Sequence, residues 1–410
     1  MKTNNVFALD LGTTKFCFGN IKFNSPGCPP SIETISVNAG GMRRGMLTDF
    51  EKAKKSLLTL IDIAESEFNT NIVKVVVGIA GSHLQSNIFK TKIPVQNQIV
   101  KDSTLETLKL HAMKQKPSFH KENLHAIPLN YFLDEREATN SPEGFSADFI
   151  TGKFFRIEAD KHYLNDVINL CNHCGLEVKN LYAEPYASAC ATLTEEEKQY
   201  GVMIADIGGG TTDGIIFHQG LPTRLFTINI GGMLMTHDLA IGLGIPFETA
   251  EHLKLSIGLD RTKLNQRIVA NNLQNKEVRI SNEDLYMILF SRVLELSTLI
   301  KQHLDSHSLP LKSGLVLTGG GSDVQGIEKM MSYILKIPVR KSLPNPCKQL
   351  NLDIKDQKTF EQRQLASKYS TVSGMLILEQ LMNLRKNPSA RHGVFEKYFQ
   401  NFVSWVKELS

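Results

Sequence analysis

Two short segments, one in each half of the chain, combine Asp, Gly and Thr in the same order. Residues 6–15 read VFALDLGTTK and residues 201–214 read GVMIADIGGGTTDG, so in both an apolar run ends at Asp before Gly and two Thr. Glycine lets backbone N–H groups approach a phosphate, Thr hydroxyls add donors, and a carboxylate can hold the water shell of Mg²⁺. The matching pair therefore predicts a clamp for a nucleoside triphosphate.

A third glycine run lies nearer the C-terminus. Residues 313–335 read SGLVLTGGGSDVQGIEKMMSYIL, which is an apolar strand pattern, three Gly and a Ser, and then a helical pattern. Such a turn lets a nucleotide lie flat against bare backbone beside the N-terminus of a helix. The chain contains no G-x-x-x-x-G-K-[ST] sequence, so a P-loop is excluded as the phosphate site.

The elements that must position the first two motifs are strands. Each motif lies between two apolar runs, with FCFGNIKF following the first and GIIFHQG following the second. This pattern predicts two β-hairpins with Gly/Thr turns. Because the 410 residues suffice for two or more domains with buried cores, we expect the hairpins to face each other between two halves of a duplicated fold.

The composition excludes several classes of protein. With 46 Lys+Arg and 42 Asp+Glu, the net charge of +4 is too balanced for a dedicated nucleic-acid binder. No run approaches the length of a transmembrane helix, and the N-terminal stretch lacks the pattern of a signal peptide. The six scattered Cys predict reduced thiols in a cytoplasmic protein, with Cys171 and Cys174 forming a core pair rather than a metal site.

In this order, the three motifs resemble the phosphate-1, phosphate-2 and adenosine motifs of the actin-like ATPase superfamily, which includes actin, Hsp70 and hexokinase. The resemblance implies an α/β, actin-like (ribonuclease H-like) fold of two duplicated domains that bind ATP and Mg²⁺. It implies that Asp10 and Asp206 hold Mg²⁺ through water. The implied phosphate and adenosine loops comprise Asp10, Gly12, Thr13, Thr14, Lys15, Asp206, Gly208, Gly209, Gly210, Thr211, Thr212, Gly319, Gly320 and Gly321.

Three further segments carry the same resemblance. TAEHLK (249–254) is similar to the A-E-x-x-K pattern that contacts the ribose, which nominates Glu251 and Lys254, and NIGGMLMT (229–236) adds Gly231 and Gly232. YAEPYASACATL (182–193) resembles the helix that connects the two halves. There the resemblance implies that Glu184 orients the attacking water of what is at most a weak ATPase. The alternative for Glu184 is a solvated side chain favoured by the helix dipole.

The segment of residues 83–160, which interrupts the first half, points to one branch of this superfamily. It predicts a strand near 86–95, a helix near 102–115, and strands near 124–133 and 149–158. This order resembles the SHS2-type 1C subdomain of the bacterial FtsA family, and GGMRRGMLTD (40–49), ENLHAIPLNYFLDE, SPEGF and ASKYSTVSGMLIL (366–378) agree. The implied boundaries are 1A at 1–82 and 161–200, 1C at 83–160, 2A at 201–239 and 306–383, 2B at 240–305, a linker at 384–393 and a terminal helix at 394–410.

The terminal segment, VFEKYFQNFVSWVKELS, holds the only Trp of the chain. On a helix its apolar side chains share one face, and aromatic residues with basic residues nearby favour the interface of an anionic membrane. The alternative is a helix docked on the core. The predicted membrane face comprises Phe395, Tyr398, Phe399, Phe402, Trp405, Val406 and Leu409.

The resemblance also implies a function. A protein of this kind self-associates through 1C and binds the cytoplasmic face of the inner membrane at mid-cell. There it anchors the polymer FtsZ through 2B and recruits other division proteins. The alternatives are a PilM-like scaffold of type IV pilus assembly, a small-molecule kinase of the same fold and an Hsp70-like chaperone.

Overall fold

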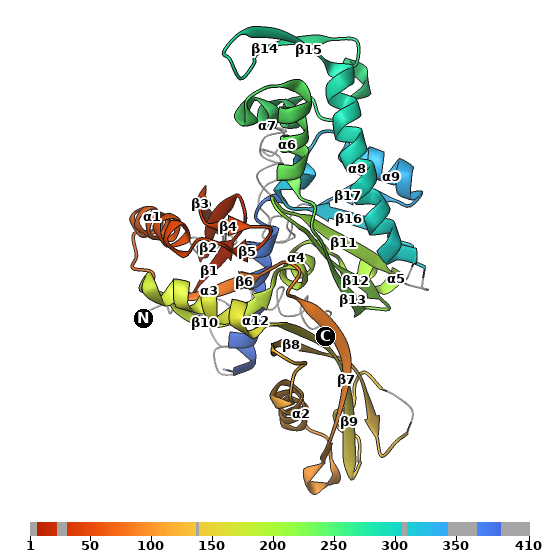
Figure 1. The fold of residues 1–410 in the computed structure, drawn as a ribbon. Helices are drawn as coiled ribbons and strands as arrows, with labels where there is room; N and C mark the ends of the chain where they lie inside the picture. The colour runs from red at the N-terminus through yellow and green to blue at the C-terminus, as the bar shows by residue number, and fades with distance from the viewer. Residues whose placement is uncertain (1–5, 23–30, 137–138, 306–309, 343–366, 387–410) are drawn as a thin grey trace.

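The computed structural model describes residues 6–22, 31–136, 139–305, 310–342 and 367–386, which form two α/β domains with an insert on the first (Figure 1). Each domain is built on a five-stranded mixed sheet. The insert projects away from both sheets, and the smaller lobe of the second domain extends at the opposite end of the molecule (Figure 1).

The first sheet has the strand order β10-β6-β1-β2-β3. β1, β2 and β3 pair antiparallel, whereas β1, β6 and β10 pair parallel. All five residues of β1 are buried, as expected for a central strand that is covered on both faces. The strand bounds are β1 (Phe7–Leu11), β2 (Lys15–Lys22), β3 (Ser31–Asn38), β6 (Lys74–Ile79) and β10 (Glu177–Ala183).

The second sheet repeats this topology with the order β13-β12-β11-β16-β17. β11, β12 and β13 pair antiparallel, and β11, β16 and β17 pair parallel. The predicted duplication and both predicted hairpins are therefore confirmed. The strand bounds are β11 (Val202–Ile207), β12 (Thr212–His218), β13 (Leu221–Ile228), β16 (Leu315–Thr318) and β17 (Val339–Lys341).

Helices cover both faces of the first sheet. Side chains that alternate along β1 divide between two apolar clusters, so that Leu9 packs with α1 and α3 while Ala8 packs with α12. α1 is capped by Asp49, whose carboxylate accepts from Lys52 N at 3.0 Å. The bounds are β4 (Met42–Arg43), β5 (Met46–Leu47), α1 (Phe50–Phe68), α3 (Lys161–His173), α4 (Glu184–Thr192), α5 (Glu195–Tyr200) and α12 (Ser370–Lys386).

α12 returns the chain from the second domain to the first. It crosses α4 at Gly374, where a Cβ would lie 1.8 Å from Ala187 O. Further along, Glu379 is 2% exposed and accepts hydrogen bonds from Lys179 Nζ (2.5 Å), Asn180 Nδ2 (2.7 Å) and Tyr182 OH (2.9 Å). These three donors lie on β10, so Glu379 fixes α12 to the edge of the first sheet.

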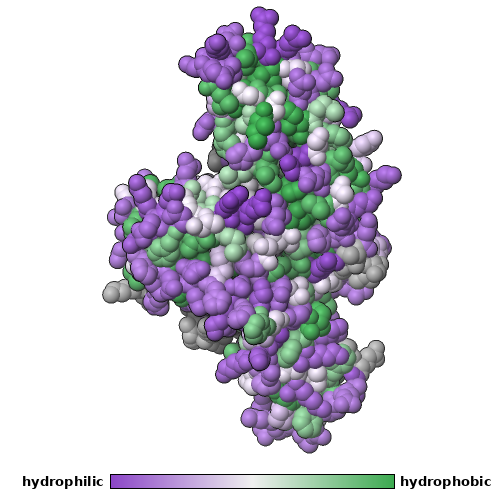
Figure 2. All heavy atoms as spheres, in the orientation of Figure 1, coloured by the Kyte–Doolittle hydropathy of each residue, from purple (hydrophilic) through white to green (hydrophobic). Residues whose placement is uncertain are grey.

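The second domain packs its helices around a separate apolar cluster. Its smaller lobe carries a two-stranded sheet, β14–β15, and shows more apolar surface on the face in Figure 2 than the insert does. Ile241, Leu273 and Met287 are each more than half exposed there. The bounds are α6 (Gly232–Leu243), α7 (Phe247–Ser256), η2 (Arg261–Lys263), β14 (Arg267–Asn271), β15 (Glu277–Ser281), α8 (Asn282–Asp305), η3 (Gly320–Asp323) and α9 (Ile327–Leu335).

The insert is a three-stranded antiparallel sheet, β7-β9-β8, with one helix, as the strand–helix–strand–strand pattern predicts. On β9, Arg156 and Glu158 form an ion pair of 2.6 Å whose side chains are 6% and 0% exposed. Gln85 Nε2 also donates to Glu158, at 2.8 Å. The bounds are β7 (Gln85–Pro94), η1 (Gln96–Gln98), α2 (Asp102–Lys114), β8 (Lys121–Leu133) and β9 (Phe149–Asp160).

Three expectations about local structure need correction. The second insert strand, β8, begins at Lys121 rather than near residue 124. The glycine run continues into the short η3, and α9 starts only at Ile327, after Gly326 adopts a left-handed conformation (φ +81°). α12 extends through Lys386, so residues 384–386 of the predicted linker are helical.

Other boundaries stay predictions. The rest of the linker and the terminal helix with its seven membrane-face residues lie outside the described residues. None of the helices in the described ranges is both long and apolar enough to span a bilayer.

The crossing of α12 and α4 gives a stability test. We expect Gly374→Ala to lower the free energy of unfolding by about 1–3 kcal/mol, because the new methyl group overlaps the Ala187 carbonyl. Thermal unfolding measures the change. Gly242→Ala in α6 is the matched control, since its methyl group meets only the flexible end of Ile288 and we expect little loss. Equal stability of the two variants would contradict the close crossing.

Candidate nucleotide site

The two hairpin turns predicted to hold phosphates meet face to face. One joins β1 to β2 and the other joins β11 to β12. A Cβ on Gly209 would lie 2.3 Å from Thr14 Cγ2, and a Cβ on Gly210 would lie 2.6 Å from Thr13 Oγ1. Because real Cβ atoms do not approach so closely, this contact between the domains requires bare backbone in the second turn.

The glycines at the start of α6 extend the same surface. Gly232 N donates to Gly208 O at 2.8 Å, and a Cβ on Gly231 would lie 2.5 Å from Gly209 O. A Cβ on Gly232 would also lie 3.2 Å from Gly321 Cα. The second hairpin turn, the start of α6 and η3 therefore form one continuous backbone surface.

The other two glycines of the run 319–321, Gly319 and Gly320, differ in what surrounds them. A Cβ on Gly319, which has φ +81°, would lie 2.2 Å from Asp206 Oδ1, so this residue packs against the carboxylate. A Cβ on Gly320 would meet only the side chain of Lys368, no closer than 3.4 Å. Gly320 is half-buried and has no backbone neighbour that a Cβ would meet, so it could lie beside a nucleotide.

Asp10 lies at the end of β1 with 7% of its surface exposed. Its Oδ1 is buried and has no hydrogen-bond partner among the described residues. Burial raises the pKa of Asp10 to about 6, although Lys15 opposes the shift. A buried carboxylate oxygen without a donor is one that a hydrated cation can satisfy.

Asp206 occupies the equivalent position in the second domain, at the end of β11. Its Oδ2 accepts from Ser188 Oγ of α4 at 2.6 Å and from Thr371 Oγ1 of α12 at 3.2 Å. Burial raises the pKa of Asp206, while these hydrogen bonds oppose the rise. Both helices between the domains therefore fix the orientation of this carboxylate.

Glu184 is the first residue of α4, and its carboxyl group lies against β6. A Cβ on Gly78 would be 2.6 Å from Glu184 Oε1, so the glycine provides the space for this side chain. Burial, followed by the charges of Asp10, Asp206 and Asp213, raises the pKa of Glu184 well above its usual range. Glu184 therefore lies among carboxylates rather than on a solvated helix end.

Two lysines bring positive charge to the same surface. Lys15 Nζ donates to Lys368 O at 2.6 Å and lies 4.4 Å from the centre of the Tyr369 ring. Lys254 is 3% exposed, and its Nζ donates to Glu251 Oε2 at 2.6 Å and to Gly232 O at 3.2 Å. Burial lowers the pKa of Lys254, and Glu251 opposes that shift. Glu251 thus holds Lys254 beside the glycine surface.

These residues fit a magnesium–nucleotide. In the described part of the chain, no group of three or more His, Cys, Asp or Glu side chains is arranged to hold a metal ion. Asp10 and Asp206 would contact Mg²⁺ through its water shell, as predicted, and Asp10 Oδ1 has no other partner among the described residues. Lys15 and the glycine N–H groups would bind phosphates, Glu251 and Lys254 would contact the ribose, and Glu184 would orient a water.

Comparison with known families decides the relationship. A model of the FtsA cell-division protein matches residues 203–372, and a model of the SHS2 domain inserted in FtsA matches residues 81–157. The chain belongs to the FtsA family. FtsA of Pseudomonas aeruginosa is 28% identical over 361 residues, which cover 84% of each chain. FtsA of Buchnera aphidicola is 26% identical over 433 residues, which cover 100% of this chain and 99% of the relative.

Solved structures agree on the fold. The FtsA-family chain matches a chain of the PilM–PilN type IV pilus biogenesis complex with a TM-score of 0.61 and 16% identity, over 90% and 96% of the two chains. It matches MreB 5 of Spiroplasma citri bound to AMPPNP with a TM-score of 0.54 and 16% identity, over 95% and 100%. The predicted α/β, actin-like fold with an SHS2-type insert is confirmed.

Sequence analysis missed one carboxylate of this FtsA-family site. Asp213, the last residue of DIGGGTTD, lies directly across the hairpin from Asp206. Its Oδ1 accepts from Thr227 Oγ1 (2.6 Å) and from Gly81 N (3.2 Å), and its Oδ2 accepts from Thr211 Oγ1 (2.7 Å). Burial raises the pKa of Asp213 to about 6. The first motif gives no signal for it, because Cys17 occupies the equivalent position.

The predicted threonines do not all face the same way. Thr212 is fully buried and its hydroxyl donates to Ile230 O at 2.7 Å, so this hydroxyl supports the fold instead of facing a phosphate. Thr13 accepts from Gly45 N at 3.0 Å, whereas Thr14 is exposed in the first turn. A Cβ on Gly12 would lie 2.9 Å from Lys15 O, which explains why this turn needs glycine.

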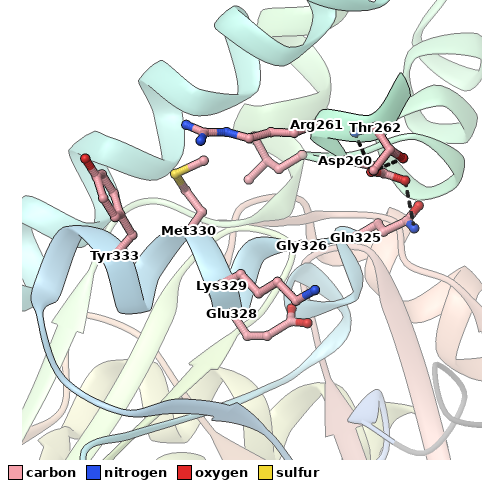
Figure 3. A pocket seen from close by; sticks show the side chains of 10 residues that line it. Asp260, Arg261, Thr262, Gln325, Gly326, Glu328, Lys329, Met330 and Tyr333 are labelled. Carbon is pink, nitrogen blue, oxygen red and sulfur yellow. Dashed lines mark hydrogen bonds between the residues drawn. The ribbon is translucent and has the colours of Figure 1, made fainter. Parts of the chain in front are cut away.

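A groove of about 600 Å³ lies elsewhere, between residues 259–262 and the start of α9 (Figure 3). Gln325 Nε2 donates across it to Asp260 Oδ2 at 3.4 Å, and the Arg261 side chain extends on the side of Tyr333 (Figure 3). None of the predicted nucleotide-binding residues lines this groove. It is therefore separate from the candidate site.

Asp10 has a buried oxygen without a donor, so removing its charge is predicted to stabilise the fold and to weaken nucleotide binding. Because burial raises the pKa of folded Asp10 to about 6, its ionisation removes stability as pH rises from about 4 to 6, and the loss persists above that range. We expect Asp10→Asn to melt about 2–4 °C higher than the unaltered protein at pH 7.5 without nucleotide.

The same variant should lose the melting-temperature rise that Mg-ATP gives the unaltered protein. Differential scanning calorimetry at pH 7.5 and pH 5 measures both effects, and the gain without nucleotide should shrink at pH 5. A lower melting temperature for Asp10→Asn at pH 7.5 would contradict the assigned burial.

Proposed function

We propose that this FtsA-family protein binds Mg-ATP between its two domains, self-associates, and anchors FtsZ to the cytoplasmic face of the inner membrane. One observation carries the proposal: the two duplicated hairpin turns meet through bare glycine backbone beside Asp10 and Asp206. The two turns and the two carboxylates occupy equivalent positions in the two halves, which supports one ligand bound between them. The solved MreB relative bound to AMPPNP supports the same ligand class.

The bound nucleotide has a defined position in this proposal. Mg²⁺ would neutralise charge on the phosphates, and Asp10 and Asp206 would hold it through its water shell. In the proposal Lys15 binds phosphate oxygens, Glu251 and Lys254 contact the ribose, and the base lies along Gly320. Any cleavage of ATP uses water oriented by Glu184, whose raised pKa falls when a cation enters the carboxylate cluster.

The membrane and partner roles rest on the family and on the sequence. The family's relatives are cell-division proteins, and the terminal segment carries the predicted aromatic face. The insert exposes apolar residues suited to self-association, with Phe119 86% and Leu110 57% exposed. A single amphipathic helix binds lipid reversibly, so an ATP-dependent polymer would bind through many weak contacts at once. The smaller lobe, with its apolar surface, is proposed to contact FtsZ.

Nucleotide binding is tested at Gly320. We expect Gly320→Val to keep the melting temperature of the nucleotide-free protein but to reduce affinity for Mg-ATP at least about tenfold, because the added side chain occupies the surface for the nucleotide. Binding of a fluorescent ATP analogue measures the change, and Gly242→Ala is the control. Unchanged affinity in Gly320→Val would place the nucleotide elsewhere.

Membrane binding is tested by flotation with anionic liposomes in the presence of Mg-ATP. We expect the full chain to float and a chain ending at Asn387 to remain in solution. Phe402→Asp should reduce flotation several-fold, whereas Asn401→Asp, which adds the same charge on the predicted polar face, should have little effect. If the full chain does not float, the terminal segment is not a membrane anchor.

A further inference from the structure

The insert contacts the core next to Glu184. β8 of the insert packs against β10, the edge strand of the first sheet. There the backbone N–H of Ala183 donates to Nε2 of His125 at 2.9 Å. Ala183 is the N-cap residue of α4 and directly precedes Glu184. A side chain of the insert therefore fixes the backbone from which Glu184 extends.

This hydrogen bond defines the protonation state and the tautomer of His125. Because a backbone N–H can only donate, His125 Nε2 must accept, and the ring must be neutral with its proton on Nδ1. Burial, followed by the charge of Lys109, lowers the pKa of His125 to about 3. The acceptor is therefore available throughout the physiological pH range.

Two tyrosines, one two residues before Glu184 and one two residues after it, contact the imidazole of His125. The ring lies 5.7 Å from that of Tyr182 with an interplanar angle of 26°, and 5.3 Å from that of Tyr186. Tyr182 OH in turn donates to Glu379 of α12 at 2.9 Å. The orientation of His125 is thus set by both elements that flank the carboxylate.

A second contact joins the base of the insert to the other side of the site. Gly81, where the chain leaves β6 for the insert, donates its N–H to Asp213 Oδ1 at 3.2 Å. Its carbonyl lies 3.2 Å from Thr227 Oγ1, the hydroxyl that also lies 2.6 Å from Asp213 Oδ1. The insert therefore reaches the carboxylate cluster at two points, one beside Glu184 and one at Asp213.

We propose that His125 is a positioning residue through which the insert orients Glu184 for ATP cleavage. This inference rests on the proposed function, because it concerns the nucleotide bound there. In this proposal His125 acts through its hydrogen bond to the Ala183 backbone. Since coupling between two sites is reciprocal in binding, a partner that shifts the insert would alter the nucleotide site, and nucleotide would alter binding to the insert.

Four variants separate positioning from support of the fold. His125→Leu keeps bulk but removes the acceptor, and His125→Asn keeps a polar group that is too short to reach Ala183. His125→Gln places an amide oxygen near the position of Nε2. Lys121→Met is the matched control, since it removes another contact at the base of the insert, Lys121 Nζ to His83 O at 2.8 Å, without touching α4.

The measurements are single-turnover ATP cleavage and affinity for Mg-AMPPNP, on full-length protein. We expect His125→Leu and His125→Asn to cleave ATP about tenfold more slowly, because Glu184 loses its fixed orientation, with analogue affinity within about twofold of the unaltered protein. His125→Gln should recover most of the rate, and Lys121→Met should retain it. If His125→Leu fails to fold, His125→Asn against His125→Gln makes the same comparison.

The opposing outcomes are distinct. Equal rates for His125→Asn and the unaltered protein, or a rate for His125→Gln as low as for His125→Asn, would overturn the proposal. So would the absence of any ATP cleavage by the unaltered protein, since Glu184 would then have no water to orient. Failure of the unaltered protein to bind Mg-AMPPNP would instead refute the proposed function itself.

Discussion

The close approach of the two hairpin turns is the constraint on which the rest of the structure depends. Gly209 and Gly210 press against Thr14 and Thr13 at distances that no Cβ could occupy. This contact brings the ends of β1 and β11 together, and with them Asp10 and Asp206. Asp10 is buried there with one oxygen that has no hydrogen-bond donor among the described residues, and burial raises the pKa values of both Asp10 and Asp213. The molecule thus stores unfavourable charge where a cation can relieve it.

The two halves share a topology but not a chemistry. Both sheets have the same strand directions, yet Cys17 stands opposite Asp10 where Asp213 stands opposite Asp206. The first hairpin instead contributes Lys15, whose charge offsets part of the burial-induced rise in the pKa of Asp10. One half therefore supplies a cation and the other an additional anion, so the charges around the two turns differ although the fold is symmetric.

Much of the fold was predictable because its signals are local. The Asp–Gly–Thr repeats marked both hairpins, and the alternating pattern of 83–160 marked the strands and helix of the insert. What sequence could not give were contacts between residues far apart in the chain. Asp213 resembles any polar residue after a turn until Gly81 and Thr227 are placed around its carboxylate.

His125 is a similar case, since its acceptor role needs Ala183, fifty-eight positions away. The ribose contact of Glu251 stays a prediction. In the fold Glu251 also pairs with Lys254, which the helical spacing of the two residues permits but does not specify. The extent of α12 through Lys386 was missed because Arg385 and Lys386 are as compatible with a polar helix end as with a linker.

The fastening of α12 has a mechanical consequence. Its first turn bonds to Asp206 through Thr371, while Glu379 further along is clamped by three donors on β10. A pulling force on the chain beyond Lys386 would act on the hydrogen bonds of Glu379 before it acted on the hydrogen bond between Thr371 and Asp206. The load would pass into the first sheet, and the nucleotide site would keep its geometry while the protein is pulled from its C-terminal end.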